Sequence, residues 1–304
     1  METMLRNMFQ ALGKSRSANR MARRYGFRFG ASRFVAGETI AEAVQRVQKL
    51  NESGRAVTID HLGEFVGNEE EANESAHMCL ATLDAIAESG VRSNLSIKMT
   101  SLGLDISRDL CLRNMRSILD RARTLNNFVR IDMEDYSHCQ MSLDIYKELR
   151  EEYDNVGIVI QAYLYRSEQD VEDLSRYNAN LRLVKGAYKE SPEVAFPDKK
   201  DVDSNYVKLI HRRLLNGCYT AVATHDPQIV NETKRFVKER DIPLDQFEFQ
   251  MLYGICEDLQ MQLVQEGYKV RIYVPYGVDW FGYFMRRLAE RPANVWFVLK
   301  NLFK

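Results

Sequence analysis

The sequence lacks several features that would place it in a familiar class. No apolar run approaches the roughly 18 residues of a membrane-spanning segment, so neither a transmembrane helix nor a secretory signal is expected. The five cysteines are odd in number, scattered and without a CxxC pair, which disfavours a disulfide framework and indicates a reducing compartment. The histidines and carboxylates show neither HExxH nor a His/Cys pair, so no metal site is expected.

The size of the chain allows a large core. With 304 residues, of which 45% are hydrophobic, one α/β barrel with an extension is as natural as two smaller domains. The net charge of −1 is unevenly distributed: residues 1–34 carry eight Lys and Arg against the single acid Glu2, a net charge of +7 that leaves −8 for the remainder. The amino terminus is therefore a distinct, basic segment.

This basic segment also has an apolar stripe at helical spacing, formed by Met1, Met4, Leu5, Met8 and Leu12. Such a helix can lie on an anionic membrane surface, serve as an import presequence, or pack on the body of the protein. We favour packing, because amphipathic helices most often bury their apolar stripe within the protein.

A regular alternation of helices and strands follows. Residues 37–54 are predicted to form a helix with Thr39 as its N-cap. Eight short β-branched runs then alternate with helical patterns, and each is suited to a strand buried on both faces. The runs are 56–60, 94–99, 128–133, 156–161, 181–186, 219–224, 246–251 and 270–275. Eight such alternations predict an α/β protein with a TIM-like (β/α)8 barrel.

The alternative fold is a doubly wound sheet, but GxGxxG after the first strand and a Walker A loop are both absent. We therefore expect N-terminal helices over residues 1–54 and a catalytic barrel over residues 55–304, in one domain overall. The acidic run 69–71 is predicted to begin a helix, where carboxylates complement the helix dipole. Residues 191–205 form the longest irregular stretch, either a mobile lid or a plain surface loop.

Polar residues gather at the predicted carboxyl ends of the strands, where a barrel of this kind holds its active site. They are Lys98, Asp132, Glu134, Gln161, Arg182, Lys185, Thr224, His225, Glu248, Gln250, Arg271 and Tyr273. Buried charges must be paired or must bind something. We therefore expect some of these residues to form internal Lys–Asp or Arg–Glu pairs and others to bind a ligand.

The last helix is predicted to have two faces. Tyr283, Arg286, Arg287 and Glu290 share one face by their spacing, while Phe281, Phe284, Met285 and Leu288 occupy the opposite face. Two arginines braced by a glutamate could bind a carboxylate as a rigid fork. The plain alternative is a solvated face with a ladder of ion pairs.

Seven motifs, in this order, resemble those of the proline dehydrogenase family. They are VRIDMED (129–135), VIQAY (159–163), RLVKGAY (182–188), ATHD (223–226), FEFQMLYG (247–254), RIYVPYG (271–277) and YFMRRLAE (283–290). The resemblance covers roughly residues 30 to 300, and the length is similar to that of the short monofunctional bacterial members. Lys189 agrees with that grouping, because the bifunctional relatives usually have Trp after GAY.

The resemblance implies a helix that covers the active site and an FAD-dependent enzyme that oxidises L-proline to Δ1-pyrroline-5-carboxylate. Hydride would pass from C5 to flavin N5, and the electrons would pass to a quinone, in the first step of proline catabolism to glutamate. A separate pyrroline-5-carboxylate dehydrogenase would act downstream. The resemblance implies no nucleic-acid partner and a cytoplasmic location, with peripheral contact at the inner face of the cytoplasmic membrane as an open alternative.

The resemblance also implies roles for individual residues. Asp132 and Arg182 are expected to be catalytic. The substrate residues would be Lys98, Tyr273, Tyr283, Arg286 and Arg287, whose cations would also favour the neutral form of the proline amine. The cofactor residues would be Met133, Gln161, Arg182, Lys185, Gly186, Ala187, Thr224, His225 and Glu290.

Two other classes of function remain open at this point. A class I aldolase-like lyase is the main alternative, because a strand lysine such as Lys98 or Lys185 can form a Schiff base. The non-enzymatic alternative is a binding module that uses the basic amino terminus on nucleic acid or on a membrane. The charges at the strand ends argue against a binding module.

Overall fold

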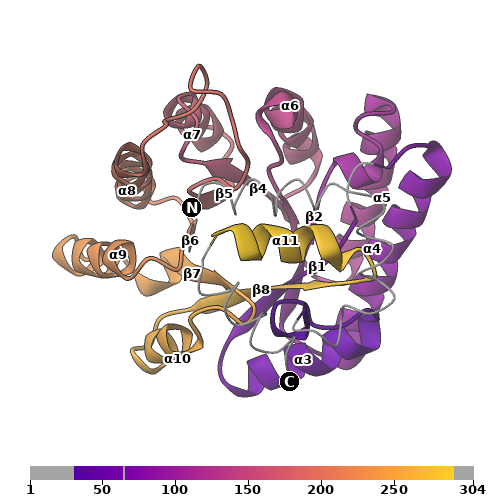
Figure 1. Cartoon of the computed structure of the whole chain (residues 1–304), viewed down its shortest axis with the longest axis horizontal. Helices are drawn as coiled ribbons and strands as arrows, with labels where there is room; N and C mark the ends of the chain where they lie inside the picture. The colour runs from indigo at the N-terminus through magenta and orange to yellow at the C-terminus, as the bar shows by residue number, and fades with distance from the viewer. Residues whose placement is uncertain (1–30, 64–65, 291–304) are drawn as a thin grey trace.

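The computed structural model describes residues 31–63 and 66–290. Its eight parallel strands close into a barrel in sequence order, which confirms the predicted fold (Figure 1). The strands are β1 (Ala56–His61), β2 (Ser93–Ile97), β3 (Val129–Ile131), β4 (Val156–Gln161), β5 (Asn180–Val184), β6 (Thr220–Ala223), β7 (Phe247–Leu252) and β8 (Val270–Tyr276). The barrel closes because β1 pairs with β8 over its whole length, from Ala56 opposite Arg271 to His61 opposite Tyr276.

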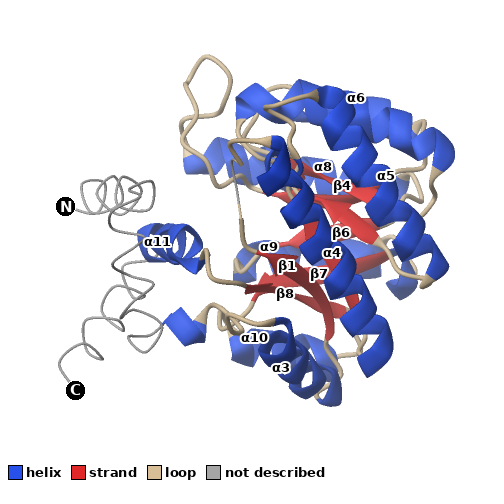
Figure 2. Ribbon diagram, turned by 90° about the vertical axis from the view of Figure 1, so that its right-hand side faces the viewer, coloured by secondary structure: helices blue, strands red, loops and turns tan. Residues whose placement is uncertain are grey.

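Helices surround the barrel, and the last one lies across the end to which the strands point (Figures 1 and 2). The α-helices are α3 (Ile40–Glu52), α4 (Glu69–Ser89), α5 (Arg108–Thr124), α6 (Tyr136–Glu152), α7 (Ser167–Ser175), α8 (Lys199–Leu215), α9 (Pro227–Glu239), α10 (Glu257–Gln265) and α11 (Trp280–Glu290). Short 3-10 turns are η2 (Ala31–Arg33), η3 (Thr100–Leu102) and η4 (Leu244–Gln246). The predicted amphipathic stripe in residues 1–12 lies outside the described residues.

Local sequence explains where the first two of these α-helices begin. Thr39 and Glu42 form a reciprocal capping box at α3: the Thr39 hydroxyl accepts from the Glu42 amide at 3.3 Å, and the Glu42 carboxylate accepts from the Thr39 amide at 3.0 Å. The Asn68 side chain caps α4 by accepting from the amide of Glu71 at 2.9 Å. The acidic run therefore occupies the first turn of α4, as predicted.

The stretch 191–205 is shorter as a loop than its composition suggested. Helix α8 begins at Lys199, where Lys199 pairs with Asp203 one turn later, so the second half of the stretch is helical. The first half is tied to the end of β4: the amide of Tyr165 donates to Val194 at 3.0 Å, and the amide of Phe196 donates to Tyr163 at 2.8 Å. Pro197 precedes the N-cap Asp198, so it lies outside α8 and does not interrupt the helix.

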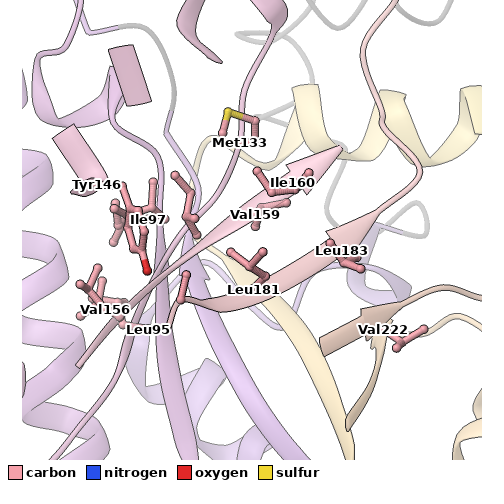
Figure 3. Packing of buried hydrophobic residues seen from close by; sticks show 14 of the residues in the cluster. Leu95, Ile97, Met133, Tyr146, Val156, Val159, Ile160, Leu181, Leu183 and Val222 are labelled. Atoms are coloured by element: carbon pink, nitrogen blue, oxygen red, sulfur yellow. The ribbon is translucent and has the colours of Figure 1, made fainter. Parts of the chain in front are cut away.

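Apolar side chains fill the space between the strands and the surrounding helices (Figure 3). Leu95, Ile97, Leu181 and Leu183 are at most 2% exposed, and Tyr146 of α6 packs beside them without exposure. The strands are thus buried on both faces, as expected for a parallel barrel. Their second face, however, is not apolar.

The interior of the barrel is filled by polar and charged side chains. Arg182 of β5 donates to the Ser96 hydroxyl of β2 at 3.2 Å, a contact between strands that are not neighbours and that therefore crosses the interior. Ser96 in turn lies 3.1 Å from the Thr58 hydroxyl of β1. Every second residue of each strand points into this interior, because successive side chains alternate between the two faces of a strand.

Two of the predicted strand-end residues were placed at the wrong end of the barrel. Glu248 and Arg271 are the second residues of β7 and β8, near the amino ends of these strands. They pair with each other, with Arg271 Nε 2.7 Å from Glu248 Oε1 and Nη2 3.1 Å from Oε2. The alternation of side chains along a strand shows which residues point into the barrel, but not how far along the barrel axis they lie.

A histidine joins two loops at the rim of the same end as α11. His138 of α6 has Nδ1 2.6 Å from Asp135 Oδ1 and Nε2 2.7 Å from Asp105 Oδ1 in the loop after η3. Partial burial opposes protonation, but the bonds to Asp105 and Asp135 outweigh it and raise the pKa of His138 above its ordinary value. Protonation of His138 therefore strengthens the link between the two loops.

Replacement of His138 by glutamine should destabilise the fold only at low pH. Because the pKa of His138 is raised in the folded state, its contribution to the free energy of unfolding is fully present below the unfolded-state pKa of about 6.5. The contribution is lost as pH rises through the folded-state pKa. The loss of unfolding free energy should stay below about 1 kcal/mol, because these groups are partly exposed to solvent. Urea unfolding at pH 5.5 and pH 9 measures it, with the exposed His77→Gln as the matched control. An equal loss at both pH values would contradict the expected role.

Candidate functional site

A cavity of about 530 Å³ lies between the carboxyl ends of the strands and α11. Strand-end residues and helix residues that are far apart in sequence meet in its wall. The predicted site residues that line it are Lys98, Asp132, Met133, Gln161, Arg182, Lys185, Gly186, Ala187, Thr224, His225, Tyr273, Tyr283, Arg286 and Arg287. The side chain of Glu290, the remaining predicted residue, lies outside those that the structure describes.

Arg182 is fixed from three directions in the floor of this cavity. Its Nη1 lies 2.5 Å from Asp132 Oδ1, its Nε lies 2.5 Å from Gln250 Oε1, and its Nη2 bonds to Ser96. The side chain of Arg182 is 6% exposed, and its guanidinium lies 5.4 Å from the centre of the Tyr273 ring. Each nitrogen thus has an acceptor on a different strand or strand end, so the cation has one orientation.

Lys98 belongs to a second buried group that touches the first. Its Nζ lies 2.8 Å from Asp60 Oδ2 and 3.4 Å from the Tyr273 hydroxyl. Tyr273 donates its proton to Asp132 Oδ2 at 2.8 Å. Burial, together with the charges of Asp132 and Asp60, raises the pKa of Tyr273 well above its ordinary value, so the phenol stays protonated. The burial of Asp60 raises its pKa, and Lys98 opposes that shift.

The last helix shows the two faces that its sequence predicts. Tyr283, Arg286 and Arg287 face the cavity, with the Arg287 guanidinium 5.0 Å from the centre of the Tyr283 ring. On the other side, Phe284 lies 6.1 Å from the ring of Phe34 and belongs to a small apolar cluster that holds the helix on the barrel. Two guanidinium groups therefore face the charged floor from above.

Lys185, the first residue after β5, lines the cavity at the end of this strand. Its ammonium lies 2.9 Å from Asp226 Oδ2 and 2.5 Å from Asp203 Oδ1, and Lys199 joins the same two carboxylates. Asp226 is also the N-cap of α9, since its side chain accepts from the amide of Gln228 at 3.1 Å. This group of four charges links the end of β5 to α8 and α9.

Two further predicted residues have defined partners. Gln161 donates from Nε2 to the carbonyl of Glu134 at 2.8 Å. The amide of Leu252 donates to His225 Nε2 at 2.9 Å, so this nitrogen carries no proton and the neutral ring is protonated at Nδ1. Glu134 is not directed into the cavity, because its carboxylate accepts from the amide of Thr100 at 3.1 Å and so caps η3.

Gly186 leaves no room for a side chain. Its φ of +121° is one that L side chains rarely adopt, and an added Cβ would lie 2.3 Å from Cδ1 of Tyr163. The ring of Tyr163 thus packs against the glycine. Packing beside the cavity therefore requires glycine at this position.

Replacement of Gly186 by alanine should lower the free energy of unfolding by about 3 kcal/mol or more, from backbone strain and from the clash with Tyr163. Urea unfolding measures this loss. Gly90 is a matched control, since it has φ +65° with no heavy atom within 4 Å of an added Cβ. Gly90→Ala should show only the backbone part, about 1 kcal/mol. Equal losses in the two variants would contradict the clash.

The described part of the chain contains no candidate metal site, no disulfide and no membrane-spanning helix. Within residues 31–63 and 66–290, no three His, Cys, Asp or Glu side chains are grouped so that they could hold a metal ion. All five cysteines are free thiols. No α-helix among these residues is long and apolar enough to cross a membrane.

Asp60, Asp203 and Asp226 are partners that the sequence reasoning did not include among the site residues. Asp60 could have been found, because it follows Thr58 at period two on the first predicted strand and so points inward beside Lys98. Asp203 could have been found only by recognising that 199–205 is helical. Asp226 stands in the ATHD motif but has no signal there that separates a lysine partner from a helix cap.

The comparisons with known proteins agree with this geometry. A family model described as proline dehydrogenase matches residues 43–300. Proline dehydrogenase 1 of Bacillus subtilis (strain 168) is 53% identical over 301 residues, which cover 99% of this chain and all of the relative. The proline dehydrogenase of Deinococcus radiodurans is 45% identical over 279 residues, 90% of each chain.

Among solved structures, proline utilization A from Bdellovibrio bacteriovorus, inactivated by N-propargylglycine, matches with a TM-score of 0.80. It is 29% identical, and the match covers 86% of this chain. The chain spans about a third of that protein, 32% of its length. From the family model and the near full-length relatives, the chain is an enzyme that belongs to the proline dehydrogenase family.

Proposed function

We propose that the protein oxidises L-proline to Δ1-pyrroline-5-carboxylate with FAD as cofactor and a quinone as final acceptor. The observation that carries the proposal is the pairing of two cavity-facing arginines on α11 with a fixed, buried Arg182 in the floor beneath them. A carboxylate receptor thus lies above a second, separate cation. The relatives named proline dehydrogenase support the same substrate.

The arginines of α11 are suited to the proline carboxylate. Proline enters as a zwitterion, and adjacent guanidinium groups offer the fork of donors that a carboxylate prefers. Arg286 and Arg287 both face the cavity, whereas Lys98 already pairs with Asp60 at 2.8 Å. We therefore assign the carboxylate chiefly to the arginines, and to Lys98 a secondary attraction weakened by its partner.

The same cations prepare the amine. Positive charge around the bound substrate disfavours an ammonium and lowers the pKa of the proline nitrogen, so the ring nitrogen is held in its neutral form. Tyr273 and Tyr283 both line the cavity and supply aromatic walls. Helix α11 restricts the access of water to the substrate, which strengthens these electrostatic effects.

The residues present fit a flavin. Met133, Val184, Met251 and Leu252 give the cavity apolar walls for a flat ring system, while Arg182 supplies one buried cation beside them. The cavity volume of about 530 Å³ lies in the usual range for cofactor sites. When bound, FAD supplies the acceptor at N5 for the hydride that leaves C5 of proline.

Further cofactor contacts are assigned to Gln161, the turn Lys185–Ala187, Thr224 and His225, with Glu290 as a brace for an arginine of α11. Arg182 would stabilise negative charge that develops on the reduced ring. A Schiff-base lyase is the weaker reading, because Lys98 and Lys185 both pair with carboxylates at 2.9 Å or less. An ion-paired ammonium is a poor nucleophile.

The cellular setting follows from the same reaction. We place the enzyme in the cytoplasm, in peripheral contact with the inner face of the membrane where a quinone is dissolved, at the first step of proline catabolism to glutamate. A separate pyrroline-5-carboxylate dehydrogenase would consume the product. We retain the proposed division into a helical extension over residues 1–54 and a barrel domain over 55–304.

Visible absorption spectra of the purified protein test the proposal, before and after anaerobic L-proline, with dithionite as the control. Flavin bands that bleach with proline are the expected result. Bands that bleach only with dithionite would keep the flavin and exclude proline as substrate. The absence of flavin bands after FAD is added back would overturn the proposal and make borohydride trapping of a lysine adduct the next measurement.

A further inference from the structure

A line of hydrogen bonds runs through the barrel from one end to the other. At the end near α11 it begins at Arg182, whose Nε lies 2.5 Å from Gln250 Oε1. Gln250 Nε2 lies 2.6 Å from Glu248 Oε1, and Glu248 forms the two-bonded pair with Arg271 near the amino ends of β7 and β8. The line continues as Arg271 Nη1 donates to the carbonyl of Val57 at 2.7 Å.

The members of this line are shielded from solvent. Gln250 is 3% exposed, Glu248 is 2% exposed and Arg182 is 5% exposed. Burial alone would raise the pKa of Glu248, but Arg271 outweighs this effect and brings the pKa to about 2. Glu248 is therefore an anion at every physiological pH, and Lys269 adds a further cation 3.4 Å from its Oε2.

The fixed charge of Glu248 decides the orientation of the neutral residue between the two arginines. A carboxylate only accepts hydrogen bonds, so the amide group of Gln250 must direct its NH2 toward Glu248. Its carbonyl oxygen then faces Arg182, which can only donate. In the opposite orientation the NH2 group of Gln250 would face the donors of Arg182, and its carbonyl oxygen would face the carboxylate of Glu248. That orientation is therefore excluded.

We propose that Gln250 is a positioning residue that fixes the Arg182 guanidinium against the redox cofactor, and that the Glu248–Arg271 pair at the far end of the barrel sets its orientation. This inference rests on the proposed function, in which Arg182 stabilises the reduced cofactor. Asp132 and Ser96 hold the two terminal nitrogens of Arg182, and Gln250 alone holds Nε. With Gln250 present, all three nitrogens of the planar guanidinium have an acceptor, which fixes its plane. Without Gln250, only the two terminal nitrogens have one, and the guanidinium can tilt about the line that joins them.

The test uses the FAD-loaded full chain with Gln250→Met, which keeps the volume and removes the amide. The midpoint potential of the bound cofactor should fall by about 30 mV, which is a tenfold loss of preference for the reduced form of a two-electron couple. kcat should fall by about tenfold, while the KM for proline should stay within about twofold, because the carboxylate receptor is on α11.

The matched control is Gln260→Met. Gln260 is another buried glutamine, 1% exposed, whose Oε1 accepts from Nη1 of Arg55 at 2.7 Å, but it lies on α10 outside the barrel interior. Its variant should lose thermal stability without a change in potential. Gln250→Glu is the conservative variant, since it keeps an acceptor for Arg182, and it should restore most of the potential at the low pH where the new acid is protonated.

A double-mutant cycle separates positioning from direct contact. Arg182→Met should lower the potential by itself, and Gln250→Met should lower it no further in that background. Gln250→Asn, with an amide one methylene too short for both partners, is the second variant if Gln250→Met does not fold. An unchanged potential in these variants, or a further fall in the Arg182→Met background, would overturn the positioning role. Wild-type protein that is not reduced by proline would instead overturn the proposed function.

Discussion

Replacing Arg182 by methionine is expected to lower kcat for proline oxidation by about a thousandfold. Removal of one preorganised group that faces developing negative charge typically lowers kcat by about 10²- to 10³-fold. Arg182 belongs to this class, because its nitrogens are held by Asp132, Gln250 and Ser96 and it is almost fully buried. Stopped-flow absorbance of flavin reduction by anaerobic proline measures the rate of the step itself.

The same substitution should also destabilise the fold, so a second variant is needed. Without Arg182, Asp132, whose side chain is 12% exposed, keeps the Tyr273 hydroxyl but loses its counter-ion. Breaking such a largely buried pair lowers the free energy of unfolding by about 3–5 kcal/mol. The double substitution Arg182→Met with Asp132→Asn removes the uncompensated charge. It should recover most of the stability and none of the rate. Recovery of the rate would show that Arg182 acts only by keeping the protein folded.

Lys98→Met should lower kcat/KM for proline by about a hundredfold, because it removes a cation beside the substrate and leaves the buried Asp60 next to the site without its counter-ion. The loss of a cation also lets the proline amine keep its proton to higher pH, so the pH dependence of flavin reduction should shift upward. Rapid-mixing measurements from pH 6 to pH 10 test both effects. An unchanged pH profile would remove Lys98 from the activation of the amine.

The stability of this variant should itself depend on pH. Burial raises the pKa of Asp60, and in Lys98→Met nothing from Lys98 opposes that shift. A carboxyl with a folded pKa above its unfolded value binds more protons when folded, so stability falls as pH rises from the unfolded value of about 4 toward the raised one. Lys98→Met should therefore be less stable at pH 8 than at pH 5. The double variant Asp60→Asn with Lys98→Met should lose this difference.

The closed barrel was predictable because every strand carries a local signal. Each β-branched run is short, and each is separated from the next by a helical pattern. Some helices also carry a cap that the sequence shows, such as Thr39 or Asn68. These signals depend only on neighbours in sequence, and their number determines the architecture. The boundary at Lys199 was missed because Pro192 and Pro197 suggested a loop that in fact ends before the first turn of α8.

The candidate site was less predictable, because the sequence shows which side chains point into the barrel but not how far along the barrel axis each one lies. Period two identifies inward residues such as Arg182, Glu248 and Gln250, but the stagger of the strands decides which of them share a layer. Glu248 and Arg271 therefore joined the list of site candidates although they lie near the opposite end. Asp60, the partner of Lys98, is absent from the predicted site residues, although its period-two spacing from Thr58 points it inward.

The pairing of β1 with β8 has a consequence for folding during synthesis on the ribosome. Residues 56–61 cannot pair until residues 271–276 have been synthesised, so more than two hundred further residues are added before the barrel can close. Until then β1 and β7 each present an open edge, which is a template for aggregation. The charges of the interior also remain in water, since Arg271 brings the last partner of Glu248. We expect folding to be slow, limited by this long-range closure, and completed by the strand that also delivers Tyr273 to the site.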